Sequence, residues 1–209
     1  MAEIDVGSIV PSTRDLLQVL STRRRSLALL GVIEGERPAE EAARLADLNV
    51  SAFAHAEATP AMALAARATK TVPSLCLLAA SERAHFLAAR LQGADGVCID
   101  AAMPLDEWDR LAKTARTMRM LPLALARDAA GLEAAAKAGA RAILLRAATA
   151  AEVLDLAARA PRGVTLVGHV EGADAAVIRA LAGKVDAAVV PASVHAGAAF
   201  AELVAEVDP

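Results

Sequence analysis

Tyrosine is absent from the sequence, and aromatic residues make up only 2% of the chain. The formal net charge at pH 7 is −3. A chain so poor in stacking side chains and without excess positive charge lacks the two means by which proteins commonly hold nucleic acid. We therefore expect no nucleic acid partner. The one basic cluster, residues 23–25, is typical of a solvated helix end.

Long hydrophobic runs are also missing, although 56% of the residues are hydrophobic. No apolar stretch reaches the roughly 18 residues that span a bilayer, so we expect no membrane partner. The first residues, MAEIDVGSIVPSTRD, carry acidic side chains and lack the basic start and apolar stretch of a secretory signal. These absences predict a cytoplasmic protein.

Cysteine occurs only twice, as Cys76 and Cys98. Both residues lie within apolar, strand-like runs, and their spacing does not form a C-x-x-C motif. A disulfide is disfavoured in the reducing compartment that we expect for this chain. The sequence therefore predicts two buried free thiols.

The chain is rich in a regular alternation of two kinds of segment. Short runs of Val, Leu, Ile and Ala are each followed by a longer amphipathic segment, which is the pattern of parallel βα units. Helix-ending signals at Asn49, Gly93, Gly139 and Gly183 recur at intervals of about 45 residues, once per pair of units. The eight predicted strands are residues 26–33, 50–55, 72–79, 95–101, 121–127, 140–146, 163–170 and 185–191.

Eight such units predict a closed (β/α)8 TIM barrel of the α/β class over residues 26–209. A doubly wound open sheet is the competing interpretation, but no G-x-G-x-x-G turn follows any predicted strand. In residues 1–25, Leu16, Leu17 and Leu20 share one helical face, which predicts a short N-terminal extension helix covering the bottom or side of the barrel. We expect residues 1–209 to form a single domain.

Two segments resemble the indole-3-glycerol-phosphate synthase family of ribulose-phosphate-binding barrels. They are LQGADGVCIDAAMPLDEWDRLAKTARTMRMLPLALARDAAGLEAAAKAGARAILLR (residues 91–146) and GKVDAAVVPASV (residues 183–194), and DLLQVLSTRRRSLALL resembles the helix leading into that family's first strand. The resemblance implies a TIM barrel of tryptophan biosynthesis, a lyase that closes an indole ring with loss of carbon dioxide and water. It implies a lysine as general acid, acidic partners and a backbone cradle for the substrate phosphate.

The family's catalytic positions are largely replaced in this chain. Where the family has Glu-x-Lys after the first strand, the chain reads GVIEGERP, with Glu34 and Glu36 but no lysine. Leu77 stands in place of the third-strand lysine, and Leu125 stands in place of the fifth-strand glutamate. The asparagine that ends the sixth strand is replaced near Arg146. At the seventh strand GHVEG replaces Glu-Ser-Gly, and after the eighth strand Gly-Glu-Ser is replaced by Pro191, Ala192 and Ser193.

The lysines give the same result without an alignment. Lys70 and Lys184 precede strands, and Lys113 and Lys137 lie on predicted helices, so we expect none at the carboxyl end of a strand, where barrel enzymes assemble their sites. Arginine cannot replace lysine as a proton donor, because its pKa above about 12 keeps it charged. We therefore expect a barrel that has lost synthase activity, a pseudoenzyme serving as a noncatalytic binding or scaffold protein.

Several polar residues still fall at predicted strand ends. The candidate catalytic pair is Glu34 and His169, an acid and a base, and the candidate anion or phosphate ligands are Arg146, Gly172 and Ser193. Other polar groups at these ends are Glu36, His55, Glu57, Asp100, Arg127, Asp128, Glu171 and His195. Arg127 and Arg146 either hold an anion between them or pair with carboxylates such as Asp128.

Two hypotheses remain for the function. The first is the noncatalytic protein, binding a phosphorylated or anionic small molecule or a protein partner. The alternative is an active lyase or other barrel enzyme, including the synthase itself. Such an enzyme would use Glu34, His169 and Ser193 on the phosphorylated or anionic molecule. We expect no metal and no cofactor. The residues that could have converged on a divalent metal are His55, His169 and Asp100. Trp108, on an outer helix, either packs between helices or anchors an interface.

Overall fold

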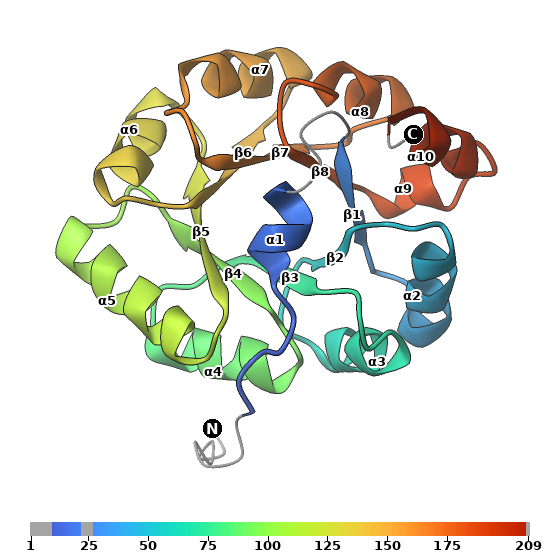
Figure 1. The fold of residues 1–209 in the computed structure, drawn as a ribbon, viewed down its shortest axis with the longest axis horizontal. Coiled ribbons are helices and arrows are strands. Elements are labelled where there is room, and N and C mark those ends of the chain that lie inside the picture. The colour runs from blue at the N-terminus through green and yellow to red at the C-terminus, as the bar shows by residue number, and fades with distance from the viewer. Residues whose placement is uncertain (1–9, 22–26, 208–209) are drawn as a thin grey trace.

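The computed structural model describes residues 10–21 and 27–207. Eight parallel strands pair in chain order and close into a barrel, since β1 pairs with both β2 and β8. Helices surround the ring of strands (Figure 1), so the predicted (β/α)8 TIM barrel is confirmed. The strands are β1 (Ala28–Val32), β2 (Ala52–His55), β3 (Ser74–Ala79), β4 (Gly96–Asp100), β5 (Leu121–Ala126), β6 (Ala142–Ala147), β7 (Thr165–Val170) and β8 (Ala187–Val190).

Each strand is followed by a helix that packs against the outside of the barrel. These outer helices are α2 (Pro38–Asp47), α3 (Pro60–Ala68), α4 (Arg83–Leu91), α5 (Leu105–Thr117), α6 (Ala129–Lys137), α7 (Ala150–Arg159), α8 (Ala175–Leu181), α9 (Ala192–His195) and α10 (Phe200–Val207). The amphipathic segment after the last strand, SVHAGAAFAELVAEV (residues 193–207), predicts a single helix, and this prediction is wrong. The chain breaks into α9 and α10 around Gly197, a poor helix former, while the His195 side chain is tied to β1.

Side chains fill the inside of the barrel. Along β1, Ala28, Leu30 and Val32 belong to an inner cluster, whereas Leu29 belongs to the cluster between strands and helices. This alternation follows from the two-residue period of a strand. Because small and branched apolar side chains pack the interior, the cylinder is a solid core rather than a pore.

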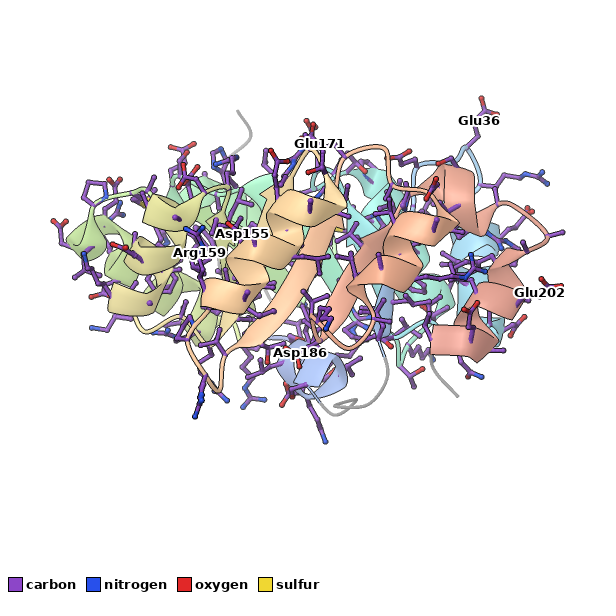
Figure 2. The ribbon with its side chains drawn as sticks, turned by 90° about the horizontal axis from the view of Figure 1, so that it is seen from above. Glu36, Asp155, Arg159, Glu171, Asp186 and Glu202 are labelled. Carbon is purple, nitrogen blue, oxygen red and sulfur yellow. The ribbon has the colours of Figure 1, made fainter. Side chains whose placement is uncertain are left out.

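The N-terminal extension closes one end of this core. Helix α1 (Leu16–Ser21) inserts Leu16 and Leu20 into the inner cluster. Gly96 provides room at the start of β4, because a Cβ there would collide with the Leu16 side chain. In Figure 2, α1 lies below the barrel near Asp186, opposite Glu36 and Glu171. Of the predicted extension helix, residues 1–9 and 22–25 lie outside the described residues, and the described part covers the bottom.

A buried carboxylate anchors the extension. Asp95 is only 1% exposed, and its side chain accepts hydrogen bonds from the Ser74 amide (2.9 Å) and the Ser12 hydroxyl. The guanidinium of Arg14 lies 2.8 Å from Oδ2, and that of Arg90 lies 3.2 Å from Oδ1. A buried charge is tolerated only when it is paired and hydrogen-bonded, and Asp95 meets both conditions through partners from the extension and from the barrel.

No helix within residues 10–21 and 27–207 is both long enough and apolar enough to cross a bilayer.

Candidate functional site

A cavity of about 650 Å³ opens at the carboxyl ends of the strands, the end at which TIM-barrel enzymes assemble their sites. We call this cavity the mouth. Its floor is apolar and its rim is charged, so it suits a molecule with a charged group and a less polar body. Its lining consists of Val32, Glu34, Ala56, Glu57, Leu77, Leu78, Ala79, Leu125, Arg127, Arg146, His169, Val170, Glu171, Gly172, Val189 and Pro191.

The structure brings four of the five candidate site residues together. Glu34, Arg146, His169 and Gly172 all line the mouth, although they come from the ends of three strands, β1, β6 and β7. Ser193 does not line it; this residue is exposed on the short helix α9. The roles assigned to these residues from the sequence stay predictions.

Arg146 and His169 are neighbours on adjacent strands. Their Cα atoms pair in the register of β6 and β7, and the two-residue period of each strand places both side chains on the inner face. The Arg146 Nε donates a hydrogen bond to Oε1 of Glu171 at 3.2 Å. Arg146 is therefore already paired with a carboxylate at the mouth.

The second arginine of the mouth is also paired. Arg127 Nη1 lies 2.6 Å from Oδ2 of Asp100 at the end of β4. Although partial burial opposes its ionisation, hydrogen bonds from Arg127 and from the Ala102 amide give Asp100 a lowered pKa. Asp128, the partner named in the sequence analysis, instead caps helix α6 by accepting from the Gly131 amide at 2.7 Å. Both arginines therefore pair with carboxylates, but not with Asp128.

His169 is a weak base in this setting. Burial, followed by the nearby positive charge of Arg146, lowers the pKa of His169 to about 4. The imidazole is therefore neutral at pH 7, and a base with so low a pKa takes up protons poorly at that pH. Its buried Nδ1 has no hydrogen-bond partner among the described residues.

An apolar bulge interrupts the pairing near the end of β3. The pairing of β3 with β4 passes from Cys76 opposite Val97 to Ala79 opposite Cys98, which leaves Leu77 and Leu78 out of register. Both leucines line the mouth, and Leu78 is 41% exposed. Bulges re-aim side chains at strand ends, and this one turns two hydrocarbon side chains toward the site.

All four lysines belong to the described residues, and none of them lines the mouth. Lys113 lies within α5 and Lys137 ends α6, while Lys70 and Lys184 lie just before β3 and β8, at the bottom. The mouth therefore contains no amine that can donate and recover a proton near neutral pH.

Two of the histidines predicted at strand ends turn away from the mouth. His55 is 2% exposed and follows the outward face of β2, and burial lowers its pKa to about 4. The ring of His195 is buried and tied to two elements: Nε2 donates to the Val32 carbonyl at 2.6 Å, and Nδ1 accepts from Arg44 Nη2 at 3.0 Å. His195 therefore fixes the loop after β8 to β1 and α2.

The remaining candidates have structural roles. Cys76 and Cys98 are free and buried, as predicted, and burial raises the pKa of both thiols. Trp108 is 1% exposed and packs among the outer helices, which excludes it as a surface anchor. In residues 10–21 and 27–207, no three His, Cys, Asp or Glu side chains are grouped so that they could hold a metal ion.

Comparison with known proteins identifies similar folds. The sequence matches no protein-family model and no curated protein. A structure of 3-hexulose-6-phosphate synthase has a TM-score of 0.72 and 16% identity, covering 87% of this chain and 98% of that chain. KGPDC from Streptococcus mutans has a TM-score of 0.66 and 10% identity, with coverages of 88% and 100%. N-acetylmannosamine-6-phosphate 2-epimerase from Clostridium perfringens has a TM-score of 0.69 and 11% identity, with coverages of 88% and 92%.

These similarities show a (β/α)8 TIM barrel that spans nearly the whole of each related chain. The identities are too low to carry an activity over to this chain. The resemblance to indole-3-glycerol-phosphate synthase, seen in residues 91–146 and 183–194, stays a prediction from the sequence.

Proposed function

We propose that the mouth binds a phosphorylated or otherwise anionic small molecule and that the chain is a noncatalytic binding protein without indole-3-glycerol-phosphate synthase activity. The observation that carries this proposal is that no lysine lines the mouth, while the side chains of Leu77 and Leu78 do. Leu77 is the residue that the family resemblance aligns with the lysine proton donor. Ring closure with loss of water needs a group that gives up a proton, and an arginine does not do so near pH 7.

Arg127 and Arg146 support the anionic ligand. Each is held by a single carboxylate, and the side chains of both pairs are partly exposed. Exposed pairs of this kind contribute little stability, about 0–1 kcal/mol, so a phosphate can replace or bridge the carboxylates at small cost. Arginine also presents two parallel donors to a phosphate. Two of the similar structures are enzymes named for sugar phosphates, which supports the same ligand class.

Gly172 adds a backbone donor to this group. It follows β7 with a φ of +65°, and its amide donates no hydrogen bond to the part of the chain that the structure describes. Free amides in such turns bind anions well. We place the expected ligand between Arg146 and the turn at Gly172, above the apolar floor. The two free thiols agree with the cytoplasmic location that we propose.

A second candidate function rests on one observation. Glu34 and His169, a carboxylate and an imidazole, both line the mouth. An enzyme that uses this pair on the same anionic ligand is the alternative. The low pKa of His169 makes it the weaker candidate, because a general base works best with a pKa near the working pH.

Ligand binding can be measured by thermal shift with phosphate, sulfate and the carboxyphenylamino ribulose phosphate used by the synthase family. A ligand at about 100 times its dissociation constant adds roughly 2.7 kcal/mol of stability. We expect Arg146→Ala to reduce this gain. Arg179→Ala is the matched control, because Arg179 is a similarly exposed arginine paired with Glu206 outside the mouth. An unchanged gain in Arg146→Ala, or no gain in the wild type, would contradict the proposal.

The same substrate tests the absence of catalysis. We expect no formation of indole-3-glycerol phosphate by the wild-type chain. Turnover that Glu34→Gln abolishes would overturn the noncatalytic assignment and establish the alternative.

A further inference from the structure

A second cavity, of about 410 Å³, lies at the opposite end of the barrel from the mouth. We call it the basal cavity. It is enclosed by the N-terminal extension on one side and by the end of α5 and the starts of β5 and β6 on the other. Four arginines line it: Arg14, Arg116, Arg119 and Arg141. Only two carboxylates, Asp15 and Asp95, line the same space.

Both carboxylates of the basal cavity are already engaged. Asp95 is paired with Arg14 and Arg90. Asp15 accepts a hydrogen bond from the Gln18 amide at 3.0 Å, at the start of α1. Arg14 is equally committed, since its Nη1 and Nη2 donate to the carbonyls of Val72 and Gly93, both at 2.9 Å.

The other three arginines have no such partners. Within residues 10–21 and 27–207, Arg116, Arg119 and Arg141 form no ion pair and donate no side-chain hydrogen bond. Arg116 lies in the last turn of α5, where the helix dipole favours a positive charge, and this placement explains it without a ligand. The helix dipole does not account for Arg119, which follows the helix, or for Arg141, which precedes β6.

Arg119 holds an unfavourable backbone conformation at this place. Its φ is +54°, in the left-handed region. The corresponding position after other helices is filled by the residues that tolerate this region, Asn49, Gly93, Gly139 and Gly183. An arginine in this conformation raises the backbone energy, and a glycine would not. The presence of arginine therefore indicates that its side chain has a role at this position. Departures from a local rule of this kind concentrate at functional sites.

We propose that the basal cavity binds a small molecule carrying a phosphate or comparable dianionic group through Arg116, Arg119 and Arg141. Three unmatched guanidiniums on one cavity concentrate positive charge, and each offers paired donors that fit phosphate oxygens. The apolar part of the lining, Leu17, Leu121 and Pro122, provides contact for the body of the molecule. This site is separate from the mouth and does not depend on the function proposed for it.

Isothermal titration of the full-length protein with inorganic pyrophosphate, at fixed ionic strength, tests the basal cavity. Arg119→Gly and Arg141→Gln each remove one proposed ligand. Arg179→Ala is the matched control, because Arg179 pairs with Glu206 outside both cavities, and Arg146→Ala reports any binding in the mouth. We expect Arg119→Gly and Arg141→Gln to raise the Kd for pyrophosphate roughly tenfold or more, since charge-assisted hydrogen bonds to a ligand are worth at least that factor. Arg179→Ala should leave this Kd unchanged.

Arg119→Gly also separates binding from folding. Because glycine suits a φ of +54°, the Tm of this variant without ligand should equal or exceed that of the wild type. Lost binding with retained Tm therefore supports the site. Pyrophosphate that fails to bind the wild type, binding that Arg119→Gly and Arg141→Gln leave intact, or binding that only Arg146→Ala removes would each overturn the proposal. The last outcome would place the anion in the mouth instead.

Discussion

The two ends of the barrel differ in whether their arginines are paired with carboxylates. At the mouth, Arg127 and Arg146 are each paired with a carboxylate from a neighbouring strand end. At the base, three arginines line a cavity without carboxylate partners among the described residues. At the end that barrel enzymes use for chemistry, both arginines are thus matched by carboxylates, whereas the end that normally serves stability has arginines without such partners. Position in a fold alone does not identify where a ligand binds.

The ends also differ in how firmly their ion pairs are built. The Asp95 network at the base is buried and joins the extension to β3, α4 and β4. The pairs at the mouth are partly exposed, so water screens them. We therefore expect substitutions in the Asp95 network to lower stability more than substitutions in the ion pairs of the mouth.

The largest effect should come from Asp95→Asn. This change keeps the shape of the side chain but leaves the buried guanidiniums of Arg14 and Arg90 without a countercharge, which should cost about 3–5 kcal/mol of unfolding free energy. Chemical denaturation measures the loss. Asp155→Asn is the matched control, because Asp155 pairs with Arg159 on the exposed face of α7 and should cost under about 1 kcal/mol. Equal losses of unfolding free energy in the two variants would show that the buried network contributes no more stability than an exposed ion pair.

A smaller effect is expected from acid at His55. Its pKa is about 4 in the folded protein and near 6.5 when unfolded, so the unfolded chain takes up the proton first as pH falls. Stability present above pH 6.5 is lost between pH 6.5 and pH 4, at about 2 kcal/mol by pH 5. His55→Leu should show a shallower decline in denaturation curves recorded across this window. A decline identical in His55→Leu and wild type would refute the assignment.

The smallest change in stability should follow Glu171→Gln, which tests the comparison directly. Removing this carboxylate leaves Arg146 unmatched, as the basal arginines are. Unfolding free energy should change by less than about 1 kcal/mol, because the pair is exposed. Affinity of the mouth for sulfate should rise, as measured by titration in the Arg119→Gly background. Unchanged or weaker affinity would show that Glu171 does not compete with an anion for Arg146.

The sequence predicted the fold well because its signals are local. The alternation of apolar runs with amphipathic segments placed all eight strands, with β5 (Leu121–Ala126) expected at 121–127. The glycines after the helices do adopt positive φ, as at Gly93 and Gly139. The break between α9 and α10 was missed, because the expected helix spanned a single Gly197 that the amphipathic pattern alone tolerates.

The candidate site was predicted only in part. Residues at strand ends had to gather at one end of the barrel, and Glu34, Arg146, His169 and Gly172 do so. Whether a side chain faces the mouth or the helices depends on strand register, which is why the outward turn of His55 was missed. The basal cavity could not be predicted from the sequence, because its arginines come from separate elements and form no motif.

By itself the sequence determined the eight βα units, the extension helix and the lack of a lysine at any strand end, since each depends on residue type and on short-range order. Only the tertiary structure settled which charges are matched. Arg127 meets Asp100, 27 residues away, rather than the adjacent Asp128, and Ser12 meets Asp95 across 83 residues. The physical reason is that electrostatic pairing depends on distance in space and on burial, and barrel closure sets both for residues far apart in the chain.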